Sequence, residues 1–447
     1  MLRFGTDGIR GVANRELTPE LVTALGRAAA RVLGAGQPFV IGRDTRRSGP
    51  MLAAALVAGL CAEGANVFDA GVLPTPGVAH LAATHDLPAA MVSASHNPFA
   101  DNGVKLFATG GRKLDDVAEA RVERELEALT GGAIARGDAD AGPGGRVAAW
   151  PDPEGDYLGH LATALGSPSF RGRRVVVDAG NGAAYRVAPR ALEQLGATVD
   201  VCNVEPDGEN INAGCGSTDP EELQALVVER GADLGLAFDG DADRVIAVDE
   251  RGRLVDGDQM LAVIAIDRRS RGLLVGDAIV ATVMSNLGLR RALDAHGIDV
   301  VETPVGDRNV LLALEERGLV LGGEQSGHLV LREVATTGDG TLTGLALLDV
   351  MTRTGRPLSE LAAVVQPLPQ VLRNVTVDDR DALAVAEDFW AAVRAAEADL
   401  GDDGRVLVRP SGTEPLVRVM VEASTQDRAE AVAASLAAAA AAACARR

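Results

Sequence analysis

The chain has 447 residues, of which 47% are hydrophobic and only 3% aromatic, and this length suggests about three domains of ~150 residues each. Its formal net charge of -20 opposes a broad affinity for nucleic acid or for an anionic membrane, because both partners reward a basic face. The 52 glycines, together with alternating Ala-rich and Val/Ile/Leu-rich stretches, are typical of a glycine-looped α/β enzyme.

Residues 1–150 are expected to form a first α/β domain. Thr18-Pro19 is a helix-start signal, and helical spacing follows it over residues 19–33. Further helices are predicted over 50–63 and 76–84, and short strands over 39–41, 66–68 and 90–92. Because strands that alternate with helices usually run parallel, a mainly parallel sheet is expected. The last strand leads directly into Ser93-Ala94-Ser95.

Two further α/β domains are expected over residues 151–252 and 253–368. The second has predicted strands over 175–177, 198–201 and 234–238 and helices over 183–195 and 220–229. The third has predicted helices over 259–267 and 310–316 and strands over 300–301 and 319–321. In each of the three domains a buried strand leads into a polar loop, which is where ligands gather in open α/β sheets.

The last segment, residues 369–447, changes character and predicts a smaller α+β domain. Strands are expected over 374–377, 406–408 and 416–421, and a helix over 383–396. The second and third of these strands flank the polar loop from Arg409 to Pro415. Its two hydroxyls and its glycine, with Arg418 beyond, could hold a phosphate, although a polar hairpin turn is the alternative.

An acidic loop follows the strand over 234–238. Asp239, Asp241 and Asp243 stand at alternate positions, so their carboxylates can converge on a hard divalent cation, for which magnesium is the natural candidate. A calcium EF-hand, with Glu250 as its twelfth residue, and a metal-free acidic loop are the alternatives. Arg244 stands where an EF-hand needs glycine, and a strand is predicted after it.

The segment Ser93-Ala94-Ser95-His96-Asn97-Pro98 places hydroxyls beside an imidazole. That grouping can take and return a proton when a hydroxyl gains or loses a phosphoryl group, although a turn with a serine cap is an equally simple interpretation. A magnesium ion with three carboxylates commonly completes its coordination with phosphate oxygens and water, so a phosphate carrier near the acidic loop is expected.

With these three loops in view, the chain resembles the α-D-phosphohexomutases from Phe4 to its C-terminal domain. The resemblance implies four domains around a central cleft, three of related α/β topology and a smaller fourth. It also implies that Ser95 is the phosphoserine, with Ser93 a weaker candidate, and that its phosphate joins Asp239, Asp241 and Asp243 as a magnesium ligand.

The resemblance also implies roles for residues outside the metal site. Arg10, His96, Lys105 and Arg244 match positions around the transferring phosphate. Glu324, Ser326 and His328 match the sugar-recognition loop. Arg409, Ser411, Gly412, Thr413 and Arg418 match the clamp for the phosphate that does not react. One departure is Ala242, where many relatives have glycine; no loss of function is expected from it.

The motifs from Phe4 to Gly11, Thr303 to Arg308 and Gly323 to His328 resemble those of family members that act on amino-sugar phosphates. We therefore expect interconversion of glucosamine 6-phosphate and glucosamine 1-phosphate, with glucosamine or glucose 1,6-bisphosphate as intermediate or activator and Lys105 or His96 as the base. The alternatives are a mutase for glucose or mannose phosphates, a phosphosugar phosphatase and a non-catalytic phosphosugar-binding regulator.

The four cysteines are scattered without a C-x-x-C pair, which favours free thiols in a reducing compartment. The N-terminal residues lack a hydrophobic signal region, and no run of ~18 strongly apolar residues occurs, so a cytoplasmic protein is expected. A homodimer is one assembly that the Ala- and Val-rich first helix would allow.

Overall fold

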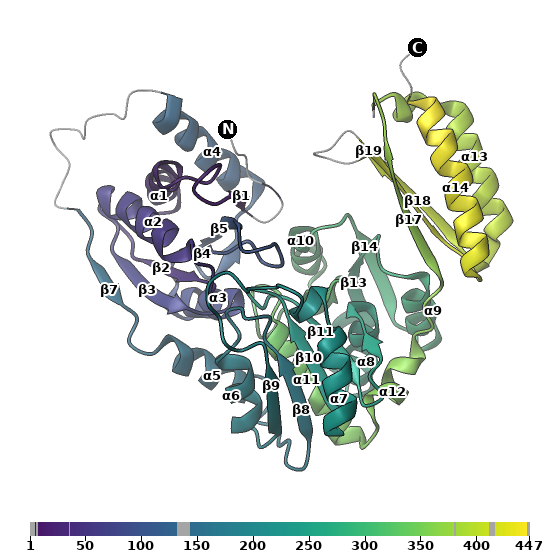
Figure 1. The fold of residues 1–447 in the computed structure, drawn as a ribbon, viewed down its shortest axis with the longest axis horizontal. Coiled ribbons are helices and arrows are strands. Elements are labelled where there is room, and N and C mark those ends of the chain that lie inside the picture. The colour runs from purple at the N-terminus through teal and green to yellow at the C-terminus, as the bar shows by residue number, and fades with distance from the viewer. Residues whose placement is uncertain are drawn as a thin grey trace. The chain divides into compact units, whose positions relative to one another are not determined.

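The computed structural model describes residues 5, 8–34, 36–131, 144–379, 381–410 and 416–444. The chain divides into two compact units (Figure 1). The first comprises residues 1–282 and 301–363, and the second comprises residues 283–300 and 364–447. The predicted domain boundaries near residues 150, 252 and 368 stay predictions.

The first sheet has the strand order β1-β5-β4-β2-β3-β7, with β6 paired to β5. Its strands are β1 (Ile9–Val12), β2 (Phe39–Arg43), β3 (Val67–Val72), β4 (Ala89–Val92), β5 (Asp101–Ala108), β6 (Arg112–Lys113) and β7 (Val147–Ala149). Strands β4, β2, β3 and β7 run parallel, as predicted, whereas β5 pairs antiparallel with β1, β4 and β6. The sheet is therefore mixed rather than mainly parallel.

The helices of this sheet are α1 (Pro19–Leu33), α2 (Gly49–Ala62), α3 (Thr75–His85) and α4 (Asp116–Gly131). Helix α1 begins as predicted, because the Thr18 hydroxyl accepts a hydrogen bond from Leu21 N and proline occupies the first turn. Helices α1 and α2 touch backbone to backbone: a Cβ on Gly59 would lie 2.1 Å from Thr23 O. Helix α3 contacts β2 and β4.

The second sheet has the order β12-β11-β10-β8-β9. Its strands are β8 (Arg174–Asp178), β9 (Thr198–Cys202), β10 (Leu234–Phe238), β11 (Val245–Asp249) and β12 (Leu254–Val255), and its helices are α5 (Pro153–Ala164), α6 (Val187–Gln194) and α7 (Glu221–Arg230). The helix predicted over 183–195 is shorter than expected. Ala183 N instead donates to Gly240 O, which ties the preceding turn to the acidic loop.

The third sheet has the order β14-β13-β15-β16. Its strands are β13 (Ala278–Thr282), β14 (Asp299–Thr303), β15 (Leu321–Gly323) and β16 (Leu329–Leu331). The helices of the first unit in this part of the sequence are α8 (Gly257–Ser270), α10 (Asp307–Arg317), α11 (Gly340–Thr354) and α12 (Leu358–Leu361), whereas α9 (Leu287–Ala295) belongs to the second unit. Asp256 and Gln259 form a capping box that starts α8. The strand predicted over 319–321 instead begins at Leu321.

The second unit contains an antiparallel sheet of order β17-β19-β18, contacted by two helices. Its strands are β17 (Gln370–Thr376), β18 (Arg405–Pro410) and β19 (Leu416–Glu422), and the helices are α13 (Glu387–Leu400) and α14 (Gln426–Ala443). This is the predicted α+β arrangement. Helix α13 begins four residues later than predicted, because residues 381–385 form a 3-10 turn.

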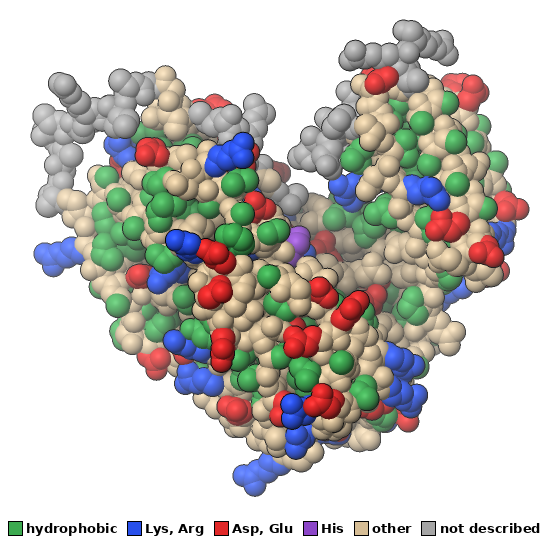
Figure 2. Space-filling view, in the orientation of Figure 1, with side chains coloured by type: hydrophobic (Ala, Val, Ile, Leu, Met, Phe, Trp, Pro, Cys, Tyr) green, Lys and Arg blue, Asp and Glu red, His purple; other side chains and the backbone are tan. Residues whose placement is uncertain are grey.

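The surface carries charges of both signs. On the face shown in Figure 2, acidic and basic side chains are interspersed. Among the described residues, no helix combines the length and the apolar character needed to cross a membrane.

Candidate functional site

Three carboxylates converge directly after strand β10. Asp239, Asp241 and Asp243 are buried, and each offers a carboxylate oxygen within 4.8 Å of those of the other two. Strand β10 is buried along its whole length between β8 and β11, so its carboxyl end fixes where this loop starts. The structure therefore brings the three predicted metal ligands together.

The EF-hand alternative for this loop is wrong. The loop leads into a strand, β11, which begins at Val245, and not into the helix that an EF-hand requires. Glu250, the twelfth residue of that hypothetical loop, accepts hydrogen bonds from the backbone and hydroxyl of Ser359. Its carboxylate is thus engaged at a different place.

Ser95 lies against this acidic loop. Its Oγ donates a hydrogen bond to Asp239 Oδ2 at 2.6 Å, and the residue is 1% exposed, with a positive φ of 53°. Ser93 is oriented otherwise: its Oγ donates to Asp44 Oδ2 and accepts from Ser95 N. Of these two serine hydroxyls, the one that faces the carboxylates is therefore that of Ser95.

The surroundings of Asp239 and Asp243 shift the pKa values of these two carboxyl groups in opposite directions. Burial, reinforced by the negative charges of Asp243 and Asp241, raises the pKa of Asp239. Burial also acts to raise the pKa of Asp243, but the nearby Lys105, His328 and Arg244 outweigh it and lower that pKa. A cation between the carboxylates would relieve this repulsion.

The residues present fit a divalent cation. Asp241 Oδ1 and Asp243 Oδ1 are buried and have no hydrogen-bond partner among the described residues, although a buried carboxylate oxygen is costly to leave unsatisfied. The other oxygens are engaged: Asp241 Oδ2 accepts from the Thr75 hydroxyl at 2.5 Å and lies 2.7 Å from Lys105 Nζ, which is 2.9 Å from Asp243 Oδ2.

The predicted basic residues lie around Ser95. His96 Nδ1 is 3.3 Å from Ser95 Oγ and 3.3 Å from Arg244 Nη1. Burial and the positive charges of Arg244 and Arg10 lower the pKa of His96 to about 4, so its ring is neutral at pH 7. Arg10, Arg244 and Lys105 give the acidic loop a rim of positive charge, which suits a phosphoryl group.

The predicted sugar-recognition residues split into two environments. Glu324, 8% exposed, accepts from Gly306 N at 3.0 Å, and the Ser326 hydroxyl lies 3.4 Å from its other oxygen. His328 is 1% exposed and packs against the acidic loop, with Nδ1 3.7 Å from Asp243 Oδ1. Its Nε2 accepts from Gly338 N. His328 therefore supports the acidic loop from within the protein.

In the second unit, Arg409 and Arg418 stand opposite each other in the β18–β19 pairing. Like charges directly opposite on neighbouring strands are destabilising, so this placement is suited to a bound anion. Burial and the charge of Arg418 lower the pKa of Arg409. Ser411, Gly412 and Thr413 lie outside the described residues.

Several side chains that touch the site were missed by the sequence analysis. Arg46, which is fully buried, donates to backbone carbonyls of the Ser95 loop, and Asn212 donates to two of the same carbonyls. Thr75 binds Asp241 from the start of α3. A signal was available for two of them, because both the Asp44–Ser48 run and Thr75 follow buried strands of the first sheet.

Ala242 occupies a position that favours glycine. Its φ is +56° and its side chain is buried, while its carbonyl accepts from Gly340 N at 3.0 Å. A left-handed conformation costs an alanine about 1–2 kcal/mol. Against this stands the greater backbone entropy that glycine loses on folding, about 0.5–1 kcal/mol. The alanine at position 242, where many relatives have glycine, therefore strains the local backbone.

We expect Ala242→Gly to raise the free energy of unfolding by about 0.5–1 kcal/mol, the difference between these two effects. Differential scanning calorimetry should show a higher unfolding temperature. Ala237→Gly, in buried strand β10, is the matched control and should lower it. An Ala242→Gly protein that unfolds earlier than the parent would contradict the strain argument.

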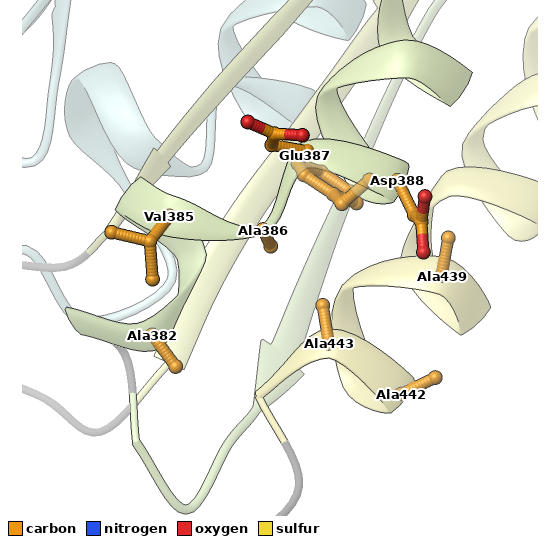
Figure 3. A pocket seen from close by; sticks show the side chains of 9 residues that line it. Ala382, Val385, Ala386, Glu387, Asp388, Ala439, Ala442 and Ala443 are labelled. Atoms are coloured by element: carbon orange, nitrogen blue, oxygen red, sulfur yellow. The ribbon is translucent and has the colours of Figure 1, made fainter.

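The second unit also contains a pocket between the start of α13 and the end of α14 (Figure 3). Its lining residues are Ala382, Val385, Ala386, Glu387, Asp388, Phe389, Ala439, Ala442 and Ala443. The lining combines apolar groups with two carboxylates, which would repel a phosphate. This pocket does not suit a phosphorylated ligand.

The arrangement of a buried serine, three converging carboxylates and a basic rim agrees with comparisons to known proteins. Family models for the four domains of phosphoglucomutase/phosphomannomutase match the chain, with α/β/α domain I over residues 1–131, domain II over 155–252, domain III over 256–368 and the C-terminal domain over 372–439. The chain belongs to the phosphoglucomutase/phosphomannomutase family.

Within this phosphohexomutase family, the curated relatives include proteins named phosphoglucosamine mutase. That of Desulforudis audaxviator is 54% identical over 428 residues, covering 95% of this chain and 94% of the relative. That of Salinispora tropica is 55% identical over 443 residues, covering 97% of each. The chain is thus an isomerase of the phosphohexomutase family, in its phosphoglucosamine mutase group.

Solved structures share the fold. A phosphoglucomutase/phosphomannomutase family protein from Burkholderia thailandensis matches with a TM-score of 0.80 and 27% identity, covering 97% of each chain. The N-acetylphosphoglucosamine mutase of Aspergillus fumigatus matches with a TM-score of 0.71 and 19% identity, covering 99% of this chain and 96% of that one. The four-domain phosphohexomutase architecture predicted from the sequence is confirmed.

Proposed function

We propose that this phosphoglucosamine mutase uses Ser95 as its phosphate carrier. Phospho-Ser95 donates its phosphoryl group to the 1-hydroxyl of glucosamine 6-phosphate: the Ser95 Oγ–P bond breaks as the O1–P bond forms. The bound glucosamine 1,6-bisphosphate then reorients, and its 6-phosphoryl group passes to Ser95 Oγ: the O6–P bond breaks as the Oγ–P bond forms, and O6 gains the proton that the serine hydroxyl gives up. Glucosamine 1-phosphate leaves, and the phosphoenzyme is restored.

The observation that carries this proposal is the contact between Ser95 Oγ and Asp239 Oδ2, at 2.6 Å, beside two further carboxylates. A serine that served only to cap a turn would not need its hydroxyl buried against a cluster of carboxylates. It is well placed to carry a phosphoryl group whose charge a cation offsets.

We assign Mg²⁺ to the oxygens of Asp239, Asp241 and Asp243, with the phosphate of Ser95 as the further ligand. Carboxylates and phosphate are the hard oxygen ligands that this ion prefers, and the bound ion would offset negative charge on the transferring group. The buried Oδ1 atoms of Asp241 and Asp243, which have no hydrogen-bond partner in the described part of the chain, support this assignment.

The proton released from the sugar hydroxyl needs an acceptor, and His96 and Lys105 are the two candidates beside the reacting group. The low pKa of His96 keeps its ring neutral at pH 7. Lys105 Nζ instead lies within ion-pair distance of Asp241 and Asp243. Lys105 therefore shares these partners with the proposed metal site.

The remaining residues are proposed to hold the substrate. Arg10 and Arg244 would bind the transferring phosphoryl group, and Glu324 and Ser326 would contact the sugar from the predicted sugar-recognition loop, whose His328 packs against the acidic loop. The phosphate that does not react would be held by Arg409, Ser411, Gly412, Thr413 and Arg418. A bisphosphate intermediate must be held at its non-reacting end during each transfer, so a second, basic site is required.

Phosphorus NMR of the magnesium-loaded enzyme tests the substrate. With glucosamine 6-phosphate and a trace of glucose 1,6-bisphosphate, we expect a sugar 1-phosphate signal to grow at least about 10-fold faster than from glucose 6-phosphate or mannose 6-phosphate. That ratio corresponds to about 1.4 kcal/mol of discrimination between the substrates. Faster turnover of a neutral sugar would contradict the amino-sugar assignment, and release of inorganic phosphate alone would indicate a phosphatase.

A further inference from the structure

The loop that carries Ser95 is held by side chains that bind its backbone. Arg46 makes most of these bonds: its Nη2 donates to Ser95 O at 2.8 Å and to Asn97 O at 2.7 Å. Its Nη1 donates to the carbonyls of Pro98 and Asp101, and its Nε to Asp44. All five N–H groups of the guanidinium are therefore engaged within the protein.

The peptide groups on both sides of Ser95 are fixed in this way. Ser95 N donates to Ser93 Oγ at 2.9 Å, and Ser93 in turn donates to Asp44. The carbonyl of Ser95 accepts from Arg46 and also from Asn212 Nδ2, at 2.9 Å. These bonds maintain the left-handed conformation at Ser95, which an L-residue rarely adopts.

Asn212 differs from Arg46 and Ser93, the other side chains that bind the backbone of Ser95, because it comes from another part of the chain, the loop between β9 and α7. Its Nδ2 also lies 3.1 Å from Asn97 O, and its backbone N donates to Gly180 O. A Cβ on Gly240 of the acidic loop would lie 2.6 Å from Ser95 O and 3.0 Å from Asn212 Nδ2. Asn212 thus fills the junction between the Ser95 loop and the acidic loop.

We propose that Asn212 is a positioning residue for phosphoryl transfer: by binding the carbonyls of Ser95 and Asn97, it fixes Ser95 Oγ against the acidic loop. This inference rests on the proposed role of Ser95. Asn212 touches no reacting atom in this assignment. Its loss should therefore slow the transfer step, because misplacement of a reacting group by about 1 Å can cost on the order of 10²-fold.

Two substitutions test the donor role. Asn212→Asp keeps the shape but turns oxygen lone pairs towards two carbonyls, and Asn212→Ala removes the donor without adding charge. We expect single-turnover transfer from phospho-Ser95 to glucosamine 6-phosphate to slow by about 10–100-fold in both. The substrate KM should stay within about twofold, because the contacts assigned to the sugar are intact.

Asn210 provides a matched control in the same loop. It is also half-buried and donates through Nδ2 to a backbone carbonyl, Glu205 O at 3.0 Å, which lies outside the Ser95 loop. Asn210→Asp and Asn210→Ala should leave the transfer rate within about twofold of the parent. Intact mass and phosphorus NMR of each purified protein report the phosphoserine independently of turnover.

The outcomes separate this inference from the assignment on which it rests. A parent enzyme that carries no phosphate on Ser95 during turnover would overturn the carrier role itself. With phospho-Ser95 present, a parental transfer rate in Asn212→Ala would overturn the positioning role, as would equal slowing by the Asn210 substitutions. A slow transfer step with unchanged KM, seen only in the Asn212 variants, is the expected result.

Discussion

Replacement of Ser95 by alanine is expected to lower kcat for the interconversion of glucosamine phosphates by at least about 10⁴-fold, because it removes the atom that carries the phosphoryl group between half-reactions. Ser93, the neighbouring serine, has a different environment, because its Oγ is already engaged with Asp44 and with the backbone of Ser95. The rate should be followed by phosphorus NMR, and intact mass should show the loss of phosphorylation.

The fold should survive this change. The Ser95 side chain makes one short hydrogen bond, to Asp239, and its removal leaves the backbone bonds from Arg46, Asn212 and Ser93 in place. An unfolding temperature close to that of the parent is the control. Ser93→Ala should retain the phosphoserine on Ser95. Substantial mutase activity in Ser95→Ala would show that another group carries the phosphate.

Most of the fold could be predicted because local sequence patterns indicate its strands and helices. The five residues of β10 form an apolar run before three aspartates, and α1 carries a threonine cap followed by proline. Helix α11 escaped prediction because it is buried over most of its length and lacks a polar stripe. Strand β5 escaped because it begins with Asp-Asn-Gly, a combination typical of turns.

Without the family resemblance, which also indicated isolated residues such as Arg10 and Lys105, the candidate site could be predicted only where its chemistry lies in contiguous side chains. The acidic loop and the Ser95 loop are short motifs, and the structure brings both together. Arg46 and Asn212 act instead on backbone carbonyls. Since a carbonyl carries no sequence signature, nothing along the chain pairs these two residues with the loop that they hold. Their roles appear only when the chain is folded.

Replacement of Asp241 by asparagine is expected to weaken divalent-metal binding by at least about 100-fold and to lower kcat by about 10³-fold. Asp241 Oδ2 accepts from Thr75 and faces Lys105, which leaves Oδ1, buried and without a hydrogen-bond partner in the described part of the chain, to bind the ion. An asparagine loses the negative charge, and its amide group either occupies the ligand position or turns towards the Lys105 ammonium. Both arrangements disfavour the cation.

Electron paramagnetic resonance of Mn²⁺ measures this binding directly, without turnover. Glu250→Gln is the matched control, since it removes one negative charge from a carboxylate that binds Ser359 and not the triad of Asp239, Asp241 and Asp243. Its affinity for Mn²⁺ should equal that of the parent. Parental affinity in Asp241→Asn would remove Asp241 from the metal site. An equal loss in both variants would mean that the total negative charge of this region, and not the triad, holds the ion.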